Sequence, residues 1–158
     1  MNRDQRESHF NQRSSLVIIT GEKGVGRKRL AGLLENQLFA DGRLVYYLGI
    51  GSVIYGVNAD LKRKAQASDW HEHVRRFAEV CHLLLDTGMI LIVTAVELTQ
   101  ADLEILKTVI DAEYIETFWL GPNVTTNLEY NLHLNNEESL EKIVEMIRLK
   151  LQEYDVIK

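Results

Sequence analysis

The chain has 158 residues, a formal net charge of −5 and one cysteine, Cys81. This length makes about one domain, the acidic balance excludes general binding of nucleic acid through a basic surface, and one cysteine excludes an internal disulfide. With no signal peptide and no apolar run long enough to span a membrane, we expect a cytoplasmic protein.

Strands and helices are predicted to alternate along the chain. Residues 1–14 are polar and predict a loose N-terminal arm, whereas residues 15–158 predict a single domain. The predicted elements are strand 15–20, helix 27–40, strand 43–48, an irregular stretch 49–71, helix 72–87, strand 89–96, helix 101–110, strand 114–120, strand 128–134 and helix 137–153. This order predicts an α/β protein, in which three α/β/α layers surround a five-stranded, mainly parallel sheet.

A glycine-rich turn follows the first predicted strand. Residues 16–30 read LVIITGEKGVGRKRL, which matches the strand–GxxxxGK[ST]–helix pattern of a phosphate-binding loop with Gly21 and Gly26 at its glycine positions. Gly24 and Gly26 permit close approach of an anion to successive backbone N–H groups. The residues predicted to bind phosphate are Gly21, Gly24, Val25, Gly26, Arg27, Lys28 and Arg29.

The same loop departs from the pattern where phosphoryl transfer would take place. Arg27 stands at the lysine position, and Lys28 stands where a serine or threonine hydroxyl would bind Mg²⁺. Shifting the register by one residue does not restore the hydroxyl group, because Arg29 then occupies the hydroxyl position. A cation there disfavours Mg²⁺, which needs oxygen ligands. The alternative to a binding site is a tight strand-to-helix turn with solvated basic residues.

Two acidic residues near this turn have different implications. In a parallel sheet, ligands bind beyond the carboxyl ends of the strands, where residues 21–29, 49–56 and Glu97 are expected to lie. Glu97 would be a catalytic or metal-binding carboxylate there, or would simply cap the following turn. Glu22, inside the loop, would repel phosphate, or else pair with Lys23 or Arg27 and occupy the site itself.

The chain resembles the adenylylsulfate kinase (APS kinase) family, whose members use ATP to phosphorylate adenosine 5′-phosphosulfate (APS) at its 3′-hydroxyl. Besides the loop, the similar segments are FADGRLVYYLGIGSVIYGVNADL at 39–61, HEHVRRFAEVCHLLLDTGMILIVTA at 71–95 and YIETFW at 114–119. The resemblance covers nearly the whole chain. It implies a P-loop NTPase fold, ATP or ADP as the nucleotide, and a homodimer or sulfate adenylyltransferase as the partner, with no nucleic acid and no membrane.

Positions that carry function in the family are altered here. The family segment LDGDN reads LGIGS at 48–52, so Gly49 and Gly51 replace both aspartates and leave no carboxylate there to take a proton from the substrate hydroxyl. Positions of substrate arginines in the family fall on Ile54 and Trp70. The residues that keep the family pattern on the substrate side are Asn58, Arg75 and Arg76.

The helix predicted from residue 72 allows two interpretations of these side chains. Arg75 and Arg76 would contact a substrate, or would form salt bridges within the helix. Trp70, His71 and His73 would form an aromatic platform for a base, or would simply begin a partly buried helix.

Two segments are shorter than in the family. VELTQADL at 96–103 lacks the family's proline and arginines, and after residue 123 the chain passes almost directly to its last strand, without the basic lid. Lids exclude water and supply cations to the phosphates in kinases. Because loss of one charge-stabilising group lowers a rate about 10²–10³-fold, we expect the combined losses to remove efficient catalysis.

Three functions remain open on this basis. The main prediction is a catalytically degenerate APS-kinase-like domain that binds a nucleotide or phosphosulfate and serves in regulation or assembly during sulfate activation. The alternative is an active divergent kinase that transfers the ATP γ-phosphate to APS or another small hydroxyl acceptor, with Arg27 or Lys28 on the phosphates and Glu97 on the metal. The third is a scaffold without a ligand.

Overall fold

The computed structural model describes residues 1–49 and 67–158. In chain order the elements are α1 (Arg3–Phe10), β1 (Ser15–Gly21), α2 (Arg27–Ala40), β2 (Val45–Leu48), α4 (Ala67–Leu85), β3 (Ile90–Val96), α5 (Gln100–Lys107), the 3₁₀ turn η1 (Ala112–Tyr114), β4 (Ile115–Leu120), β5 (Leu132–Leu134) and α6 (Leu140–Glu153). Across these residues no helix is long and apolar enough to cross a membrane.

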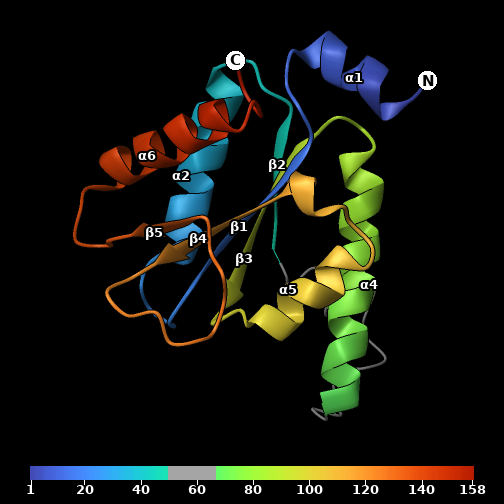
Figure 1. Ribbon diagram of the computed structural model, residues 1–158. Helices are drawn as coiled ribbons and strands as arrows, with labels where there is room; N and C mark the ends of the chain where they lie inside the picture. Colours follow the sequence, from blue (N-terminus) through green and yellow to red (C-terminus); the bar gives the residue numbers. More distant parts are fainter. Residues whose placement is uncertain (50–66) are drawn as a thin grey trace.

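The strands form one sheet in the order β2-β3-β1-β4-β5. All four neighbouring pairs are parallel, so the described sheet is entirely parallel, and the predicted α/β class is confirmed. Helices α2 and α6 cover one face, and α4 and α5 cover the other (Figure 1). This is the three-layer arrangement that alternating strands and helices predict.

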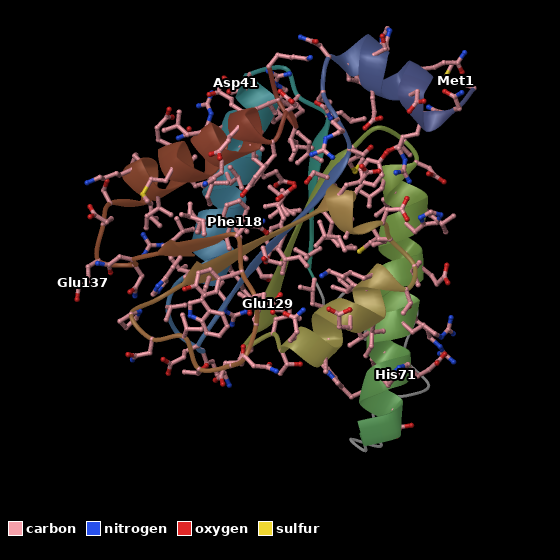
Figure 2. The ribbon with its side chains drawn as sticks, viewed as in Figure 1. Met1, Asp41, His71, Phe118, Glu129 and Glu137 are labelled. Carbon is pink, nitrogen blue, oxygen red and sulfur yellow. The ribbon has the colours of Figure 1, made fainter. Side chains whose placement is uncertain are left out.

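The central strand explains why the sheet is stable. All seven residues of β1 are buried, since the run SLVIITG is covered by helices on both faces. In β4, Phe118 and Trp119 are fully buried on opposite faces, because successive side chains of a strand alternate (Figure 2 labels Phe118). Removing either aromatic ring would therefore open a cavity in one of the two cores.

Residues 1–14 are not a loose arm. They contain α1, which begins with a capping box in which the Asn2 side chain accepts the Gln5 N–H and the Gln5 side chain accepts the Asn2 N–H. Arg3 then donates to Asp86 at 2.7 Å, and the Gln12 amide donates to the carbonyls of Leu44 and Gly88. These contacts hold α1 against the edge of the sheet where the strands begin.

The boundaries of several other elements differ from the prediction. Helix α4 is already formed at Ala67, before the predicted residue 72. Helix α6 begins at Leu140 instead of 137, because Ser139 is its N-cap and accepts the Lys142 N–H. Strand β5 has only three residues, Leu132–Leu134, since the Asn131 side chain takes the Thr117 N–H that a longer ladder would use.

A buried carboxyl group at the start of β4 makes stability depend on pH. Glu116 is 5% exposed, and its nearest described cation is Arg13, 3.8 Å away. Burial raises the pKa of Glu116 from 4.5 to about 7, although Arg13 partly opposes the shift. Between these two values the folded chain holds a proton that the unfolded chain has lost, so stability falls as pH rises through this window.

We expect Glu116→Gln to remove this dependence. Urea unfolding at pH 5 and pH 8 should show wild type losing on the order of 1–2 kcal/mol more than the variant between the two values. The variant should match wild type at pH 5 and exceed it at pH 8. Parallel pH profiles of the two proteins would contradict the assignment.

Candidate functional site

The glycine-rich loop connects β1 to α2 and has the conformation that its glycines permit. Gly24 and Gly26 have φ values of 87° and 97°. A Cβ at either position would meet no atom within 4 Å, so the backbone angle and not space requires glycine there. Gly26 is the N-cap of α2 and supplies no side-chain acceptor, which leaves backbone N–H groups at the helix start available to an anion.

The loop is fixed by the strands on either side of β1. A Cβ on Gly21 would lie 2.1 Å from the Leu120 carbonyl oxygen at the end of β4. The Gly21 carbonyl accepts the Glu97 N–H, just after β3, at 2.9 Å. Val25 fills the space beside Gly121, since a Cβ on Gly121 would lie 3.1 Å from a Val25 methyl carbon. The backbone of the loop is therefore positioned before any ligand arrives.

Three cations occupy the first turn of α2, with no acidic residue among them. Positive charge at a helix N-terminus is unfavourable by about 0.3–1 kcal/mol per residue. Arg27 also has a buried Nε without a hydrogen-bond partner, and burial lowers the pKa of its guanidinium. Within the described residues, neither Arg27, Lys28 nor Arg29 forms an ion pair. An anion bound at the loop would neutralise part of this unfavourable positive charge.

Glu22 does not neutralise the loop. In the part of the chain that the structure describes, it forms no ion pair with Lys23 or Arg27. The hypothesis that this carboxylate occupies the phosphate position is therefore not supported by the geometry.

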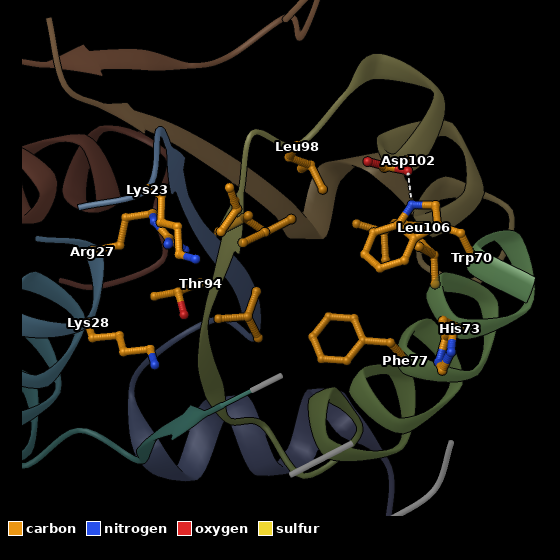
Figure 3. A pocket seen from close by; sticks show the side chains of 15 residues that line it. Lys23, Arg27, Lys28, Trp70, His73, Phe77, Thr94, Leu98, Asp102 and Leu106 are labelled. Atoms are coloured by element: carbon orange, nitrogen blue, oxygen red, sulfur yellow. Dashed lines mark hydrogen bonds between the residues drawn. The ribbon is translucent and has the colours of Figure 1, made fainter. Parts of the chain in front are cut away.

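A cavity of about 350 Å³ opens beside the loop, on the face of the sheet that α4 and α5 cover. Lys23, Arg27 and Lys28 extend toward it from one side, and Trp70, His73, Phe77 and Leu106 form the opposite wall (Figure 3). Its described lining is Ile18, Lys23, Arg27, Lys28, Trp70, His73, Val74, Phe77, Val93, Thr94, Ala95, Val96, Leu98, Asp102 and Leu106.

The only carboxylate in this described lining is already bonded. One oxygen of Asp102 accepts the Trp70 indole N–H at 2.9 Å, and the other accepts the Thr99 N–H at 3.1 Å. The Thr94 hydroxyl lies 3.0 Å from the Tyr47 hydroxyl. Gly49, directly after β2, contributes no side chain, and no group of three or more His, Cys, Asp or Glu in the described residues could hold a metal. Within the described lining, no carboxylate is therefore left free as an oxygen ligand for a metal.

Three other sequence-predicted residues, Glu97, Arg75 and Arg76, are not part of the described cavity lining. Glu97 is exposed, has a φ of 46° and is not part of the described lining. Arg75 and Arg76 do not line it either, and both contact Glu72, at 2.5 and 3.1 Å, which lowers the pKa of that carboxyl to about 2. Asn58 lies outside the described residues. Salt bridging within α4 therefore accounts for at least part of what these arginines do.

Sequence reasoning missed part of the cavity wall. Lys23 was considered only as a partner of Glu22, and Asp102 was not singled out, yet both line the cavity. Trp70 and His73 were considered as a platform, and their rings lie 6.4 Å apart in the wall. Their positions in the sequence could have predicted both residues, because Lys23 and Asp102 each follow a strand at the edge of the sheet where ligands bind.

Hydrogen bonds fix the connection between β4 and β5. Residues 121–131 contain no helix, and the Thr126 hydroxyl donates to the Leu98 carbonyl at 2.7 Å. Asn127 accepts the Gln100 N–H at 3.1 Å, and the Gln100 side chain accepts the Glu129 N–H at 2.9 Å. A segment bonded in this way to the start of α5 has little freedom to close over phosphates. Beside it lies a smaller hollow of about 270 Å³, lined by Gly121, Pro122, His133, Asn135 and Glu137.

Comparison with known proteins shows the family of the chain. The family model for adenylylsulphate kinase matches residues 13–131, and the chain belongs to this family. It is 32% identical to an adenylyl-sulfate kinase of Clostridium kluyveri over 118 residues, which are 75% of this chain and 58% of that protein. It is 36% identical to the bifunctional enzyme NodQ of a Rhizobium species over 109 residues, which are 68% of this chain and 17% of that enzyme.

Solved structures show the same fold at lower identity. APS kinase CysC of Mycobacterium tuberculosis, in complex with AMPPNP and APS, has a TM-score of 0.73 at 21% identity and covers 90% of this chain and 99% of its own. A hexameric APS kinase from Thiobacillus denitrificans has a TM-score of 0.78 at 20% identity, over 94% of this chain and 30% of that one. The chain thus spans less than two thirds of the curated relatives above, but nearly all of the CysC chain.

Proposed function

We propose that this chain is a catalytically degenerate member of the APS kinase family, which binds the phosphates of a nucleotide or phosphosulfate and serves in the regulation or assembly of sulfate activation. The observation that carries the proposal is a preformed phosphate loop with Lys23, Arg27 and Lys28 beside it and no free carboxylate in the described cavity lining. Such a site holds an anion, but offers no carboxylate there to bind a metal or accept the substrate proton.

In the proposed complex, backbone N–H groups between Gly24 and the start of α2 bind ATP or ADP phosphates, and Val25 sets the loop against Gly121. Arg27 and Lys28 supply the charge that Mg²⁺ would otherwise bring, and Arg29 adds to the field from an exposed position. The smaller hollow beside Gly121 would receive the remainder of the nucleotide.

The proposed partner is a second copy or a sulfate adenylyltransferase, in the cytoplasm. The T. denitrificans relative is hexameric, and NodQ is bifunctional with most of its length outside the match. Both observations support a search for assembly. The test is co-purification of the tagged chain with sulfate adenylyltransferase from the same cells, followed by measurement of oligomeric state.

Nucleotide binding is tested by calorimetric titration with ADP, ATP, APS and PAPS, the 3′-phosphorylated product of APS kinases, each with and without Mg²⁺. We expect a dissociation constant below about 100 μM, which corresponds to roughly −5.5 kcal/mol, for at least one of them. Mg²⁺ should leave the affinity unchanged or weaken it, because the ion neutralises the phosphate charge that the loop cations attract. No binding by any of the four would overturn the proposal in favour of a scaffold.

Arg27→Ala should change binding and stability in opposite directions. Loss of a charge-assisted contact lowers affinity for the bound nucleotide about tenfold or more. The same change removes a cation and a buried unpaired Nε from the first turn of α2, so the ligand-free variant should melt at a higher temperature than wild type. Lys150→Ala, in the last turn of α6 and outside the described cavity lining, makes the same change in net charge and should leave affinity unaltered. A variant with weaker binding and lower stability would point to general damage instead.

An active kinase remains the second candidate, and the similarity to adenylyl-sulfate kinases of two Clostridium species favours it. In that case Glu97 would act on the metal, and Glu97→Gln should abolish turnover. An unchanged rate would remove Glu97 from the mechanism.

A further inference from the structure

The large cavity has two chemically different ends. Its loop side carries the three cations Lys23, Arg27 and Lys28, whereas the opposite wall is formed mainly by carbon atoms of α4, α5 and β3 (Figure 3). Phe77 and Leu98 are each 7% exposed, and Leu106 is 2% exposed. A ligand that fills the cavity therefore needs an anionic group at one end and an apolar body at the other.

Three polar groups of the cavity lining, those of Trp70, Asp102 and Thr94, are already bonded within the protein. The Trp70 N–H donates to Asp102, the second Asp102 oxygen accepts from Thr99, and the Thr94 hydroxyl is bonded to Tyr47. A ring with many polar edges would lose its hydrogen bonds to water there and gain few in return. A ring of carbon atoms has no such bonds to lose, and its burial is favourable.

The mouth of the cavity is accessible to such a body. Trp70 and Val96 are 46% and 50% exposed, although both line the cavity. Exposed apolar side chains that continue a buried apolar wall are typical of a binding site. Trp70 lies across the cavity from the cations and is held in place by Asp102, so its ring presents a fixed surface (Figure 3).

We propose that this cavity binds a phosphate or sulfate monoester of an aromatic alcohol, with the anion on Lys23, Arg27 and Lys28 and the aromatic ring between Trp70, Phe77 and Leu98. The proposal deepens the proposed function, since it assigns a ligand class to the cavity beside the loop, and it rests on that function only through the shared cations. It implies that an aryl ester is preferred here to an ester of a nucleoside.

The test is calorimetric titration of the purified chain with five probes: 1-naphthyl phosphate, 1-naphthyl sulfate, 1-naphthol, inorganic phosphate and AMP. We expect at least one naphthyl ester to bind at least tenfold more tightly than 1-naphthol, phosphate and AMP. The comparison of the two esters identifies the preferred anion. Equal or tighter binding of AMP would overturn the proposal, because an ester of a nucleoside would then be at least as good a ligand as an ester of a carbon ring.

Variants of Trp70 locate the binding. Because this side chain is half exposed, its replacement should leave the fold intact, which a melting curve checks. Trp70→Ala should weaken the naphthyl ester at least fivefold, whereas Trp70→Phe keeps an aromatic surface and most of the affinity. Both should leave ADP affinity unchanged. An ester that binds equally well to the alanine variant would overturn the assignment to this cavity.

The ADP titration separates the two proposals. Binding of ADP with no preference for a naphthyl ester would overturn the aryl-ester inference and keep the proposed function. Binding of the ester without any binding of ADP, ATP, APS or PAPS would do the reverse.

Discussion

Gly21→Ala is expected to lower the free energy of unfolding by about 3 kcal/mol or more, or to prevent folding at 37 °C. The new methyl carbon would lie 2.1 Å from the carbonyl oxygen of Leu120, an atom of the main chain that cannot rotate away. Accommodating it requires β1 and β4 to separate, and these two strands are paired along most of their length at the centre of the sheet. Overpacking of a core already costs about 1–3 kcal/mol where side chains are able to adjust.

Gly32→Ala is the matched control for this substitution. Gly32 lies inside α2, and a Cβ there would meet no atom within 4 Å. Alanine is the better helix former by about 0.8–1 kcal/mol, so this variant should be more stable than wild type. Urea unfolding of the three proteins gives both values. Similar stability of the Gly21 variant and wild type would mean that the loop does not approach β4 as closely as described.

The second expected result concerns turnover. With APS and MgATP, the purified chain should form PAPS at least about 10³-fold more slowly than the 1–100 s⁻¹ typical of kinases. Lys28 stands at the hydroxyl position of the loop, the described cavity lining has no free carboxylate, and the segment after β4 is bonded to Gln100 of α5. Under the proposed function, electrostatic stabilisation and proton transfer would both be impaired, and each supplies about 10²-fold or more.

A coupled assay that detects ADP release measures this rate. Lys28→Ser is the informative variant, because it restores the hydroxyl that binds Mg²⁺ and removes the competing cation. The Lys28→Ser variant should bind ADP more tightly with Mg²⁺ than without it. Its turnover should stay low, because no general base takes the proton from the substrate hydroxyl. Turnover of wild type near 1 s⁻¹ would contradict degeneracy and establish the kinase alternative.

The parts of the fold that sequence predicted are those fixed by local pattern. The apolar runs of β1 and β3 carry their own signal, and both strands were confirmed. Gly21, Gly24 and Gly26 all have positive φ values, as a turn that requires glycine would have, whereas phosphate binding there stays a prediction. Helix α1 was missed because its stretch has no buried residue. Its stability comes from a capping box and from contacts with Asp86 and Gly88, which are distant in sequence.

The cavity was harder to predict than the loop. Its wall combines residues from α4, β3 and α5, and only the folded sheet brings these elements together. Arg75 and Arg76 matched the family but share Glu72, a contact three and four residues away that helical periodicity also predicts. The role of Asp102 depends on its hydrogen bond with the indole of Trp70, 32 residues earlier, and no local sequence pattern predicts such a pair.

The position of β1 in the sheet has a consequence for synthesis of the chain. Within the described sheet, Ser15–Gly21 is the strand made earliest and the one most completely buried, yet its two neighbours are Ile90–Val96 and Ile115–Leu120. Until Ile115–Leu120 has emerged, the apolar strand β1 has no hydrogen-bonded neighbour along one of its two edges. Nascent chains and truncated products that end before Leu120 should therefore be held by chaperones or aggregate, and the sheet should form only after Leu120 has emerged.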